Sequence, residues 1–176
     1  ALMDVFAKVA DSADVAATNF TFSSGVSNQK SGSIYRITGA AQDVAFIQSS
    51  SNTRTDSVTA TYTVSTGITP TYADSLLMML VAKNQGGAAS SFGTYAIATS
   101  NPSWTEQVDV NDGGTEVRAC ATAIRPEITA TGNATVVITG LDASTDAVSW
   151  FLVIPPKLDV SVSPTVVVLT STVPLV

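Results

Sequence analysis

Few residues in this chain have the type and spacing that chemistry requires, and most of those are carboxylates. Asp109, Asn111 and Asp112 lie close together and are followed by Gly113. Oxygen ligands at short spacing with a glycine at the turn are typical of calcium loops. The rest of an EF-hand loop is missing, however, and an Asp-Gly-Gly sequence is also what a β-hairpin turn uses. The sequence at these three residues is therefore consistent with either a calcium site or a plain hairpin turn.

Other catalytic or cofactor-binding patterns are absent from the sequence. The chain has no histidine and one cysteine, so a Ser-His-Asp triad, a Cys-His pair and a zinc site of Cys and His ligands are excluded. Cys120 alternates with other small residues, which predicts a buried structural thiol rather than a nucleophile. No P-loop or dinucleotide-binding glycine pattern is present. We expect no enzymatic activity, no catalytic residue and no cofactor.

The aromatic residues offer a different kind of site, a stacking platform for a sugar. Trp150 and Phe151 lie in an apolar segment and are expected in the core. Trp104 follows Pro102 in a turn. The sequence does not decide whether its side chain is exposed or buried. If exposed, it is the residue we expect to bind a glycan on a host surface.

Composition and charge limit the partners and the fold class. The formal net charge is −6 and the eight Lys and Arg residues are scattered singly, which argues against nucleic acid as a partner. No apolar segment reaches the roughly 18 residues that a membrane-spanning helix needs, so membrane insertion is not expected. Thr, Ser, Val and Ala dominate while charged residues make up 12%. That composition predicts an all-β protein with many short strands.

The longest apolar run, within residues 74–82, predicts the central strand. It lies between Pro70 and the pair Gly86-Gly87. A strand that is apolar on both sides is buried on both faces, which places it in the middle of a sandwich or barrel. Leu and Met also favour a helix, but the run is too short for a typical one and the glycines end it.

Alternating or apolar segments bounded by turn residues predict the remaining strands. They are residues 3–10, 19–22, 33–38, 57–64, 92–98, 106–110, 116–124, 134–139 and 147–154. Residues 11–14 predict a turn, and residues 48–56, rich in Ser, Asn and Thr, predict a linker or long loop. No segment sustains a helical period. We predict an antiparallel β-sandwich, jelly-roll-like, with no helix longer than about two turns.

Three parts follow along the chain. Residues 57–156 are expected to form the β-sandwich. Residues 1–47 predict a β segment similar to the back half of such a module, because three pairs of segments share their pattern and spacing. The pairs are residues 5–10 with 117–122, 19–22 with 133–136, and 34–37 with 150–153. Residues 158–176 predict an extended C-terminal arm.

The arm is expected to pack on another subunit. Pro155-Pro156 is predicted to separate it from the preceding strand, because proline cannot donate to a ladder. Residues 158–176 are rich in β-branched side chains and would expose four consecutive apolar ones in water. These four, Val166, Val167, Val168 and Leu169, are the candidate assembly residues. Folding back onto its own sheet edge is the alternative.

Several segments together resemble a known module. They are an alternating strand, a Gly/Pro turn, residues 74–82, Pro102-Ser103-Trp104-Thr105, residues 116–122 and residues 134–154. In this order they resemble a recurrent β-sandwich module of virion structural proteins of tailed bacteriophages and of large secreted bacterial surface proteins. The usual glycine before the aspartate of the central strand is Ala73 here. The resemblance implies a sandwich fold and carries no catalytic residues.

Two classes of function are consistent with these patterns. The first is a non-catalytic virion structural protein, such as a capsid decoration, fibre or tail component, whose partners are itself or other virion proteins. The second is a carbohydrate-binding or adhesion module at the cell surface or outside the cell. A pilus-like filament subunit held by donated strands is a third possibility that uses the same strand exchange.

Overall fold

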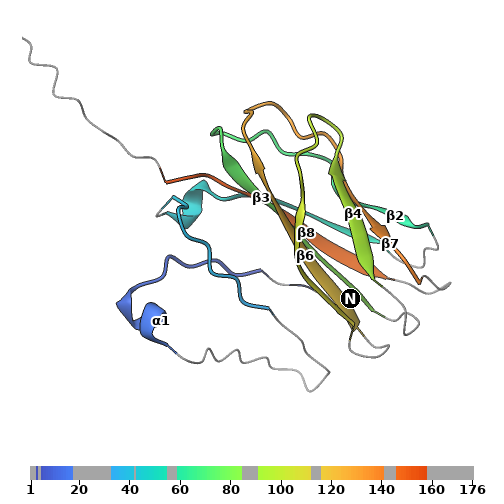
Figure 1. Ribbon diagram of the computed structural model, residues 1–176, viewed down its shortest axis with the longest axis horizontal. Coiled ribbons are helices and arrows are strands. Elements are labelled where there is room, and N and C mark those ends of the chain that lie inside the picture. The colour runs from blue at the N-terminus through green and yellow to red at the C-terminus, as the bar shows by residue number, and fades with distance from the viewer. Residues whose placement is uncertain are drawn as a thin grey trace, which may run out of the picture.

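The computed structural model describes residue 3 and residues 5–17, 33–41, 43–54, 59–84, 91–111, 116–140 and 146–157, and its strands form two antiparallel sheets that face each other (Figure 1). The strands are β1 (Gln48–Arg54), β2 (Thr61–Ser65), β3 (Ser75–Asn84), β4 (Phe92–Ile97), β5 (Thr105–Asn111), β6 (Glu116–Arg125), β7 (Ala134–Ile138) and β8 (Ala147–Ile154). Two short helices, α1 (Ser12–Ala16) and η1 (Val44–Phe46), precede them. The predicted all-β sandwich is confirmed.

The strand order explains why the sandwich is jelly-roll-like. The five-stranded sheet has the order β1-β8-β3-β6-β5 and the three-stranded sheet has the order β2-β7-β4. The pairs β1–β8, β2–β7 and β3–β6 are nested, the first strand with the last and so on inward, as in an eight-stranded jelly roll. The innermost pair, β4 with β5, is not formed, because β5 pairs with β6 and joins the larger sheet.

The predicted central strand is β3. It pairs with β6 on one side and with β8 on the other, so it lies in the middle of the five-stranded sheet. Leu77, Met79 and Val81 are fully buried toward the three-stranded sheet. There they meet alternate residues of β2, β4 and β7, such as Tyr62 and Val136. This double layer of alternating side chains is the main core.

One correction concerns residues 48–56, which were expected to be a linker. Residues 48–54 form β1 and pair with β8 along its whole length, from Gln48 opposite Val153 to Arg54 opposite Ala147. The polar sequence suits an edge strand, because its outward side chains face water and its backbone still completes the ladder. Composition alone therefore mistook a polar edge strand for a loop.

A second correction concerns the N-terminal residues. The described residues 5–10 and 33–38 form no strand, although strands were expected at residues 3–10 and 33–38. The turn expected at residues 11–14 instead begins helix α1, which Asp11 caps by accepting from the amides of Ala13 and Asp14. The strand expected at residues 19–22 lies outside the described residues, and the proposed kinship of residues 1–47 with a half-module stays a prediction.

A buried arginine fastens the loops at one end of the sandwich. Arg125, at the end of β6, has no exposed surface. Its guanidinium donates to the carbonyl oxygen of Thr99 at 2.8 Å and to the hydroxyl and carbonyl oxygens of Thr129 at 2.9 and 3.2 Å. Two loops, one after β4 and one before β7, are thus held by one side chain.

We predict that Arg125→Met lowers the free energy of unfolding by about 3 kcal/mol, a fall of about 10 °C in Tm. The cause is that the substitution leaves carbonyl oxygens without donors at a buried site. Thermal unfolding followed by circular dichroism measures it, with Arg36→Met at an exposed arginine as the matched control. If both variants have the same Tm, Arg125 does not hold the two loops together.

Candidate functional site

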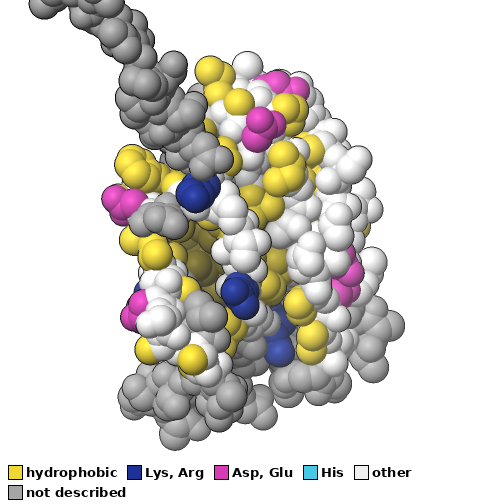
Figure 2. Space-filling model, turned by 60° about the vertical axis from the view of Figure 1, so that its left-hand side comes forward, with side chains coloured by type: hydrophobic (Ala, Val, Ile, Leu, Met, Phe, Trp, Pro, Cys, Tyr) yellow, Lys and Arg dark blue, Asp and Glu magenta, His cyan; other side chains and the backbone are white. Residues whose placement is uncertain are grey.

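The outer face of the five-stranded sheet, which points away from the three-stranded sheet, is unusually apolar. Met78 and Cys120 are buried there, as are Leu152 and Ile154 at the end of β8. Four half-buried side chains extend this surface: Leu76, Leu80, Val108 and Trp150. A sheet with one face in water normally places polar residues on that face. Figure 2 shows hydrophobic side chains lining the hollow beside the sandwich.

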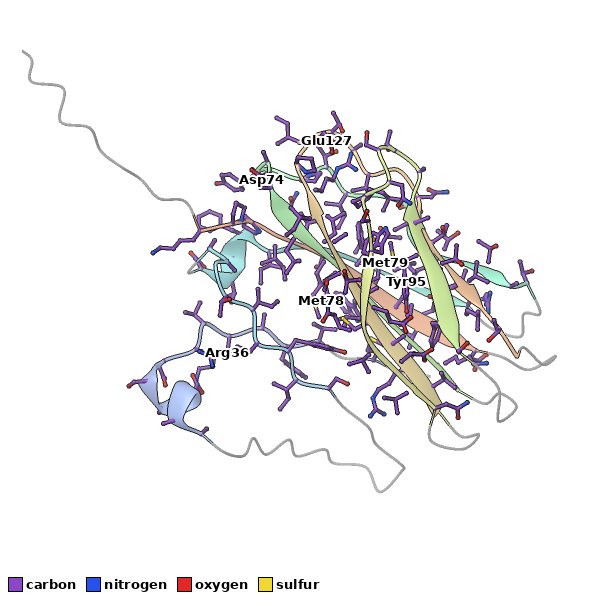
Figure 3. The ribbon with its side chains drawn as sticks, in the orientation of Figure 1. Arg36, Asp74, Met78, Met79, Tyr95 and Glu127 are labelled. Carbon is purple, nitrogen blue, oxygen red and sulfur yellow. The ribbon has the colours of Figure 1, made fainter. Side chains whose placement is uncertain are left out.

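Adjacent methionines of β3 show how one strand serves two apolar faces. Met79 points between the sheets on the side of Tyr95, whereas Met78 points toward the N-terminal residues (Figure 3). Both are buried, with exposed fractions of 0% and 3%. Because side chains alternate along a strand, a run without polar residues requires a cover on each side.

The second cover is made by N-terminal residues. We call the described residues 3, 5–17 and 33–41 the N-terminal cover. Its side chains of Val5, Tyr35 and Ala40 pack against the outer face. The indole nitrogen of Trp150 donates to the carbonyl oxygen of Met3 at 3.1 Å. The alternating sequence of the cover therefore packs on the face of a sheet instead of pairing at its edge.

The cover is also tied to the chain that follows β8. Ala40 and Pro156 form an antiparallel bridge, in which the amide of Ala41 donates to Pro155 at 3.0 Å and the amide of Lys157 donates to Gly39 at 2.7 Å. These bonds need no proline amide, and β8 itself ends at Ile154, directly before Pro155. The predicted separation of the arm from this strand stays a prediction. Residues 158–176, with Val166, Val167, Val168 and Leu169, lie outside the described residues.

Several large apolar side chains on the cover and on the outer face stay exposed. Phe6 is 83% exposed and Ile34 is 58% exposed, both on the cover. Ile124, on the outer face near the end of β6, is 55% exposed, whereas Ile128, in the loop after β6 and outside this face, is 58% exposed. Over the described residues the others are Val9, Ile37, Val44 and Phe46. We call this side, the cover with the exposed outer face, the apolar side; such clusters mark interaction surfaces.

A groove opens on the apolar side where the strands β3, β5 and β6 begin or end. Its volume is about 350 Å³, and its lining residues are Leu76, Ser103, Thr105, Thr122, Ala123 and Ile124. None of them is charged and none belongs to the N-terminal cover. The floor and rim are thus aliphatic side chains and small hydroxyl groups.

The two candidate sites from the sequence, Trp104 and Asp109, meet elsewhere, at the seam between β4 and β5. Asp109 Oδ2 accepts from the amide of Phe92 at 3.2 Å, and Asn101 Oδ1 accepts from the amide of Ile97 at 2.9 Å. Both amides belong to the edge of β4 that does not pair with β7. These side chains therefore replace the backbone bonds that a β4–β5 pair would supply.

Trp104 forms part of this seam. It is half-buried and packs against the main core, with its ring centroid 6.3 Å from that of Tyr95. Its indole nitrogen donates to Asn101 Oδ1 at 3.0 Å. The hydroxyl of Tyr95 donates to Glu106 Oε2 at 3.1 Å. The arrangement joins the two sheets, and the binding of a sugar at Trp104 stays a prediction.

The calcium candidate at Asp109, Asn111 and Asp112 stays a prediction. Asp109 and Asn111 lie on β5, whereas Asp112 lies outside the described residues. Among residues that the structure describes, no three Asp, Glu, Cys or His side chains are grouped closely enough to hold a metal ion. Partial desolvation at the sheet edge raises the pKa of Asp109, the amide of Phe92 opposes this, and Glu106 adds to it.

Cys120 is a buried structural thiol, as predicted. It has no exposed surface and lies beneath Tyr35 of the cover. Burial raises the pKa of the thiol to about 11, and burial likewise raises the pKa of the Tyr35 hydroxyl to about 12. Both groups are thus protonated at neutral pH, and Cys120 serves packing.

Comparison of the chain with protein-family models, with curated proteins and with solved structures gave no match. Neither described helix is long enough to cross a bilayer. The sequence predicted that the central run is buried on both faces but did not predict which residues cover the outer face. The signal was the neighbouring apolar positions within β3 and β8, residues 76–82 and 150–154, which require a cover on each side.

We predict that Asp109→Asn does not lower Tm at neutral pH and raises it slightly. Asparagine keeps an oxygen acceptor for Phe92 but removes a carboxylate whose pKa is raised in the folded state. A raised pKa means that the folded state binds more protons, so this group's contribution to stability falls as pH rises past the folded pKa. The advantage of asparagine should therefore vanish toward about pH 4, where the carboxyl group is protonated.

Thermal unfolding across this pH range measures the effect. Asp109→Ala is the control, because it removes the charge and the acceptor together and should cost about 1 kcal/mol. If Asn and Ala destabilise the protein equally at neutral pH, the bond to Phe92 does not hold the seam.

Proposed function

We propose that this chain is a non-catalytic structural subunit of a virion, such as a capsid decoration, fibre or tail component, and that it assembles through the apolar side. One observation carries the proposal: the exposed apolar residues of the cover, led by Phe6 and Ile34, lie on the same side as the apolar outer face. A lone subunit gains nothing from leaving such side chains in water.

The fold supports the class of function by analogy. Double-sheet jelly rolls are a common architecture of viral capsid proteins and of lectins, although a fold alone does not define a function. The polar side chains with described contacts also fit a structural role. Arg125 holds loops, Asp109 and Asn101 close the seam, and the Tyr62 hydroxyl lies 2.9 Å from Ser149 Oγ between the sheets.

The adhesion alternative has less support. Lectins share the architecture, but the aromatic residue chosen for sugar stacking, Trp104, packs on the core and donates its indole hydrogen to Asn101. A filament subunit held by donated strands uses the same apolar side, and electron microscopy of the native assembly separates that case from a capsid or tail component.

We predict that the double variant Phe6→Ser with Ile34→Ser weakens self-association or binding to a neighbouring virion subunit at least tenfold. Burying one such side chain is worth about 1.5–3 kcal/mol, and each 1.4 kcal/mol is a factor of ten in affinity. The monomer's Tm should stay unchanged, because both side chains are mainly exposed. Sedimentation velocity over a concentration series measures the association.

The matched control is Val137→Ser, on the outer face of the three-stranded sheet, where Val137 lies opposite Thr61. It removes an apolar side chain from the far side of the molecule. If Val137→Ser weakens assembly while the double variant does not, the interface is on the other sheet and the proposal fails.

A further inference from the structure

The groove on the apolar side is a place where an uncharged apolar chain fits. Leu76, Ala123 and Ile124 supply aliphatic contact, while Ser103, Thr105 and Thr122 supply hydroxyl groups at its wall. Hydroxyl groups can bond the backbone of an extended segment, and aliphatic floors accept every second side chain of a strand. A charged ligand would find no partner among these six residues.

One segment of the chain has the matching chemistry. Residues 160–176 contain no charged residue, in a sequence where charged residues make up 12% of the total. Thr165 precedes the four consecutive apolar residues Val166–Leu169, and β-branched side chains favour an extended backbone. Segment and groove thus agree in their lack of charge and in their mixture of aliphatic and hydroxyl side chains.

The point at which the described chain stops favours delivery to a neighbour. After β8, the amide of Lys157 bonds to Gly39 of the cover. The groove begins at Leu76 of β3, which lies opposite Ile154 of β8. Figure 1 shows the last described residues after β8 running outward from the sheet, so the described chain is leaving the sheet where it stops.

We propose that the groove lined by Leu76, Thr122 and Ile124 is the receptor for residues 165–169 of a second copy of this chain. The inference rests on the proposed structural function and adds to it the docking site and the donor. Donor and receptor are different surfaces, so the contact is head-to-tail: each copy gives a segment and receives one. Such contacts build rings or open filaments rather than closed two-fold dimers.

The head-to-tail geometry allows a complementation test with full-length chains. The receptor variant is Ile124→Asp, whose side chain is 55% exposed, so folding should be retained. The donor variant is Val167→Asp with Val168→Asp, because neighbouring side chains of a strand point to opposite faces and one of the two must enter the groove. Ile128→Asp, at an isoleucine that is 58% exposed and outside the groove lining, is the control.

Each variant alone should associate at least tenfold more weakly than the parent, with an unchanged monomer Tm, whereas Ile128→Asp should not. An equimolar mixture of receptor and donor variants should restore one intact contact and form dimers that grow no further. Mass photometry or sedimentation velocity resolves these species.

The other results overturn the inference in distinguishable ways. A parent chain that stays monomeric at high concentration refutes self-assembly and this inference with it. A parent that assembles while both variants assemble equally well leaves the proposed function standing and rejects the groove. Variants that fail to associate and are not rescued by mixing show that the segment folds onto its own chain or that another surface is used.

Discussion

The constraint on which this structure depends is that β8, β3 and β6 carry apolar side chains on both faces. One face is covered by the three-stranded sheet, where Leu77, Met79 and Phe151 are completely buried. The other face needs a second cover, because each large apolar side chain left in water forgoes about 1.5–3 kcal/mol. The N-terminal cover supplies it only in part, and the cover leaves its own Phe6 and Ile34 exposed. Burial of these side chains by a neighbouring molecule is the assembly that we propose.

The same constraint explains why several polar side chains hold strands and loops together. With β5 drawn into the larger sheet, the sandwich lacks its innermost strand pair, and the edge of β4 has no backbone partner in β5. Asp109 and Asn101 satisfy that edge, while Arg125 closes the loops at one end. Asp109 and Trp104, which were candidates for metal and sugar binding in the sequence, thus also make contacts that hold the fold together.

The sequence was sufficient to predict the sandwich, the central strand and most later strands, because alternation and Gly or Pro turns are local signals. It failed at β1, whose Ser-rich sequence is that of a loop until the ladder with β8 is known. It failed at residues 5–10 and 33–38, where alternation reflects packing on a sheet face. The seam at Asp109 could not be predicted either, because which strands stay unpaired is decided by the whole topology.

The central claim is that the apolar side is the assembly interface, and hydroxyl-radical footprinting of assembled and dissociated protein tests it most directly. The account predicts that Phe6, Ile34 and Ile124 react readily in the dissociated chain and are protected in the assembly. Trp104, which packs at the seam, should react equally in both. Protection at Val137 and its neighbours on the three-stranded sheet, with Phe6, Ile34 and Ile124 unchanged, would contradict the account.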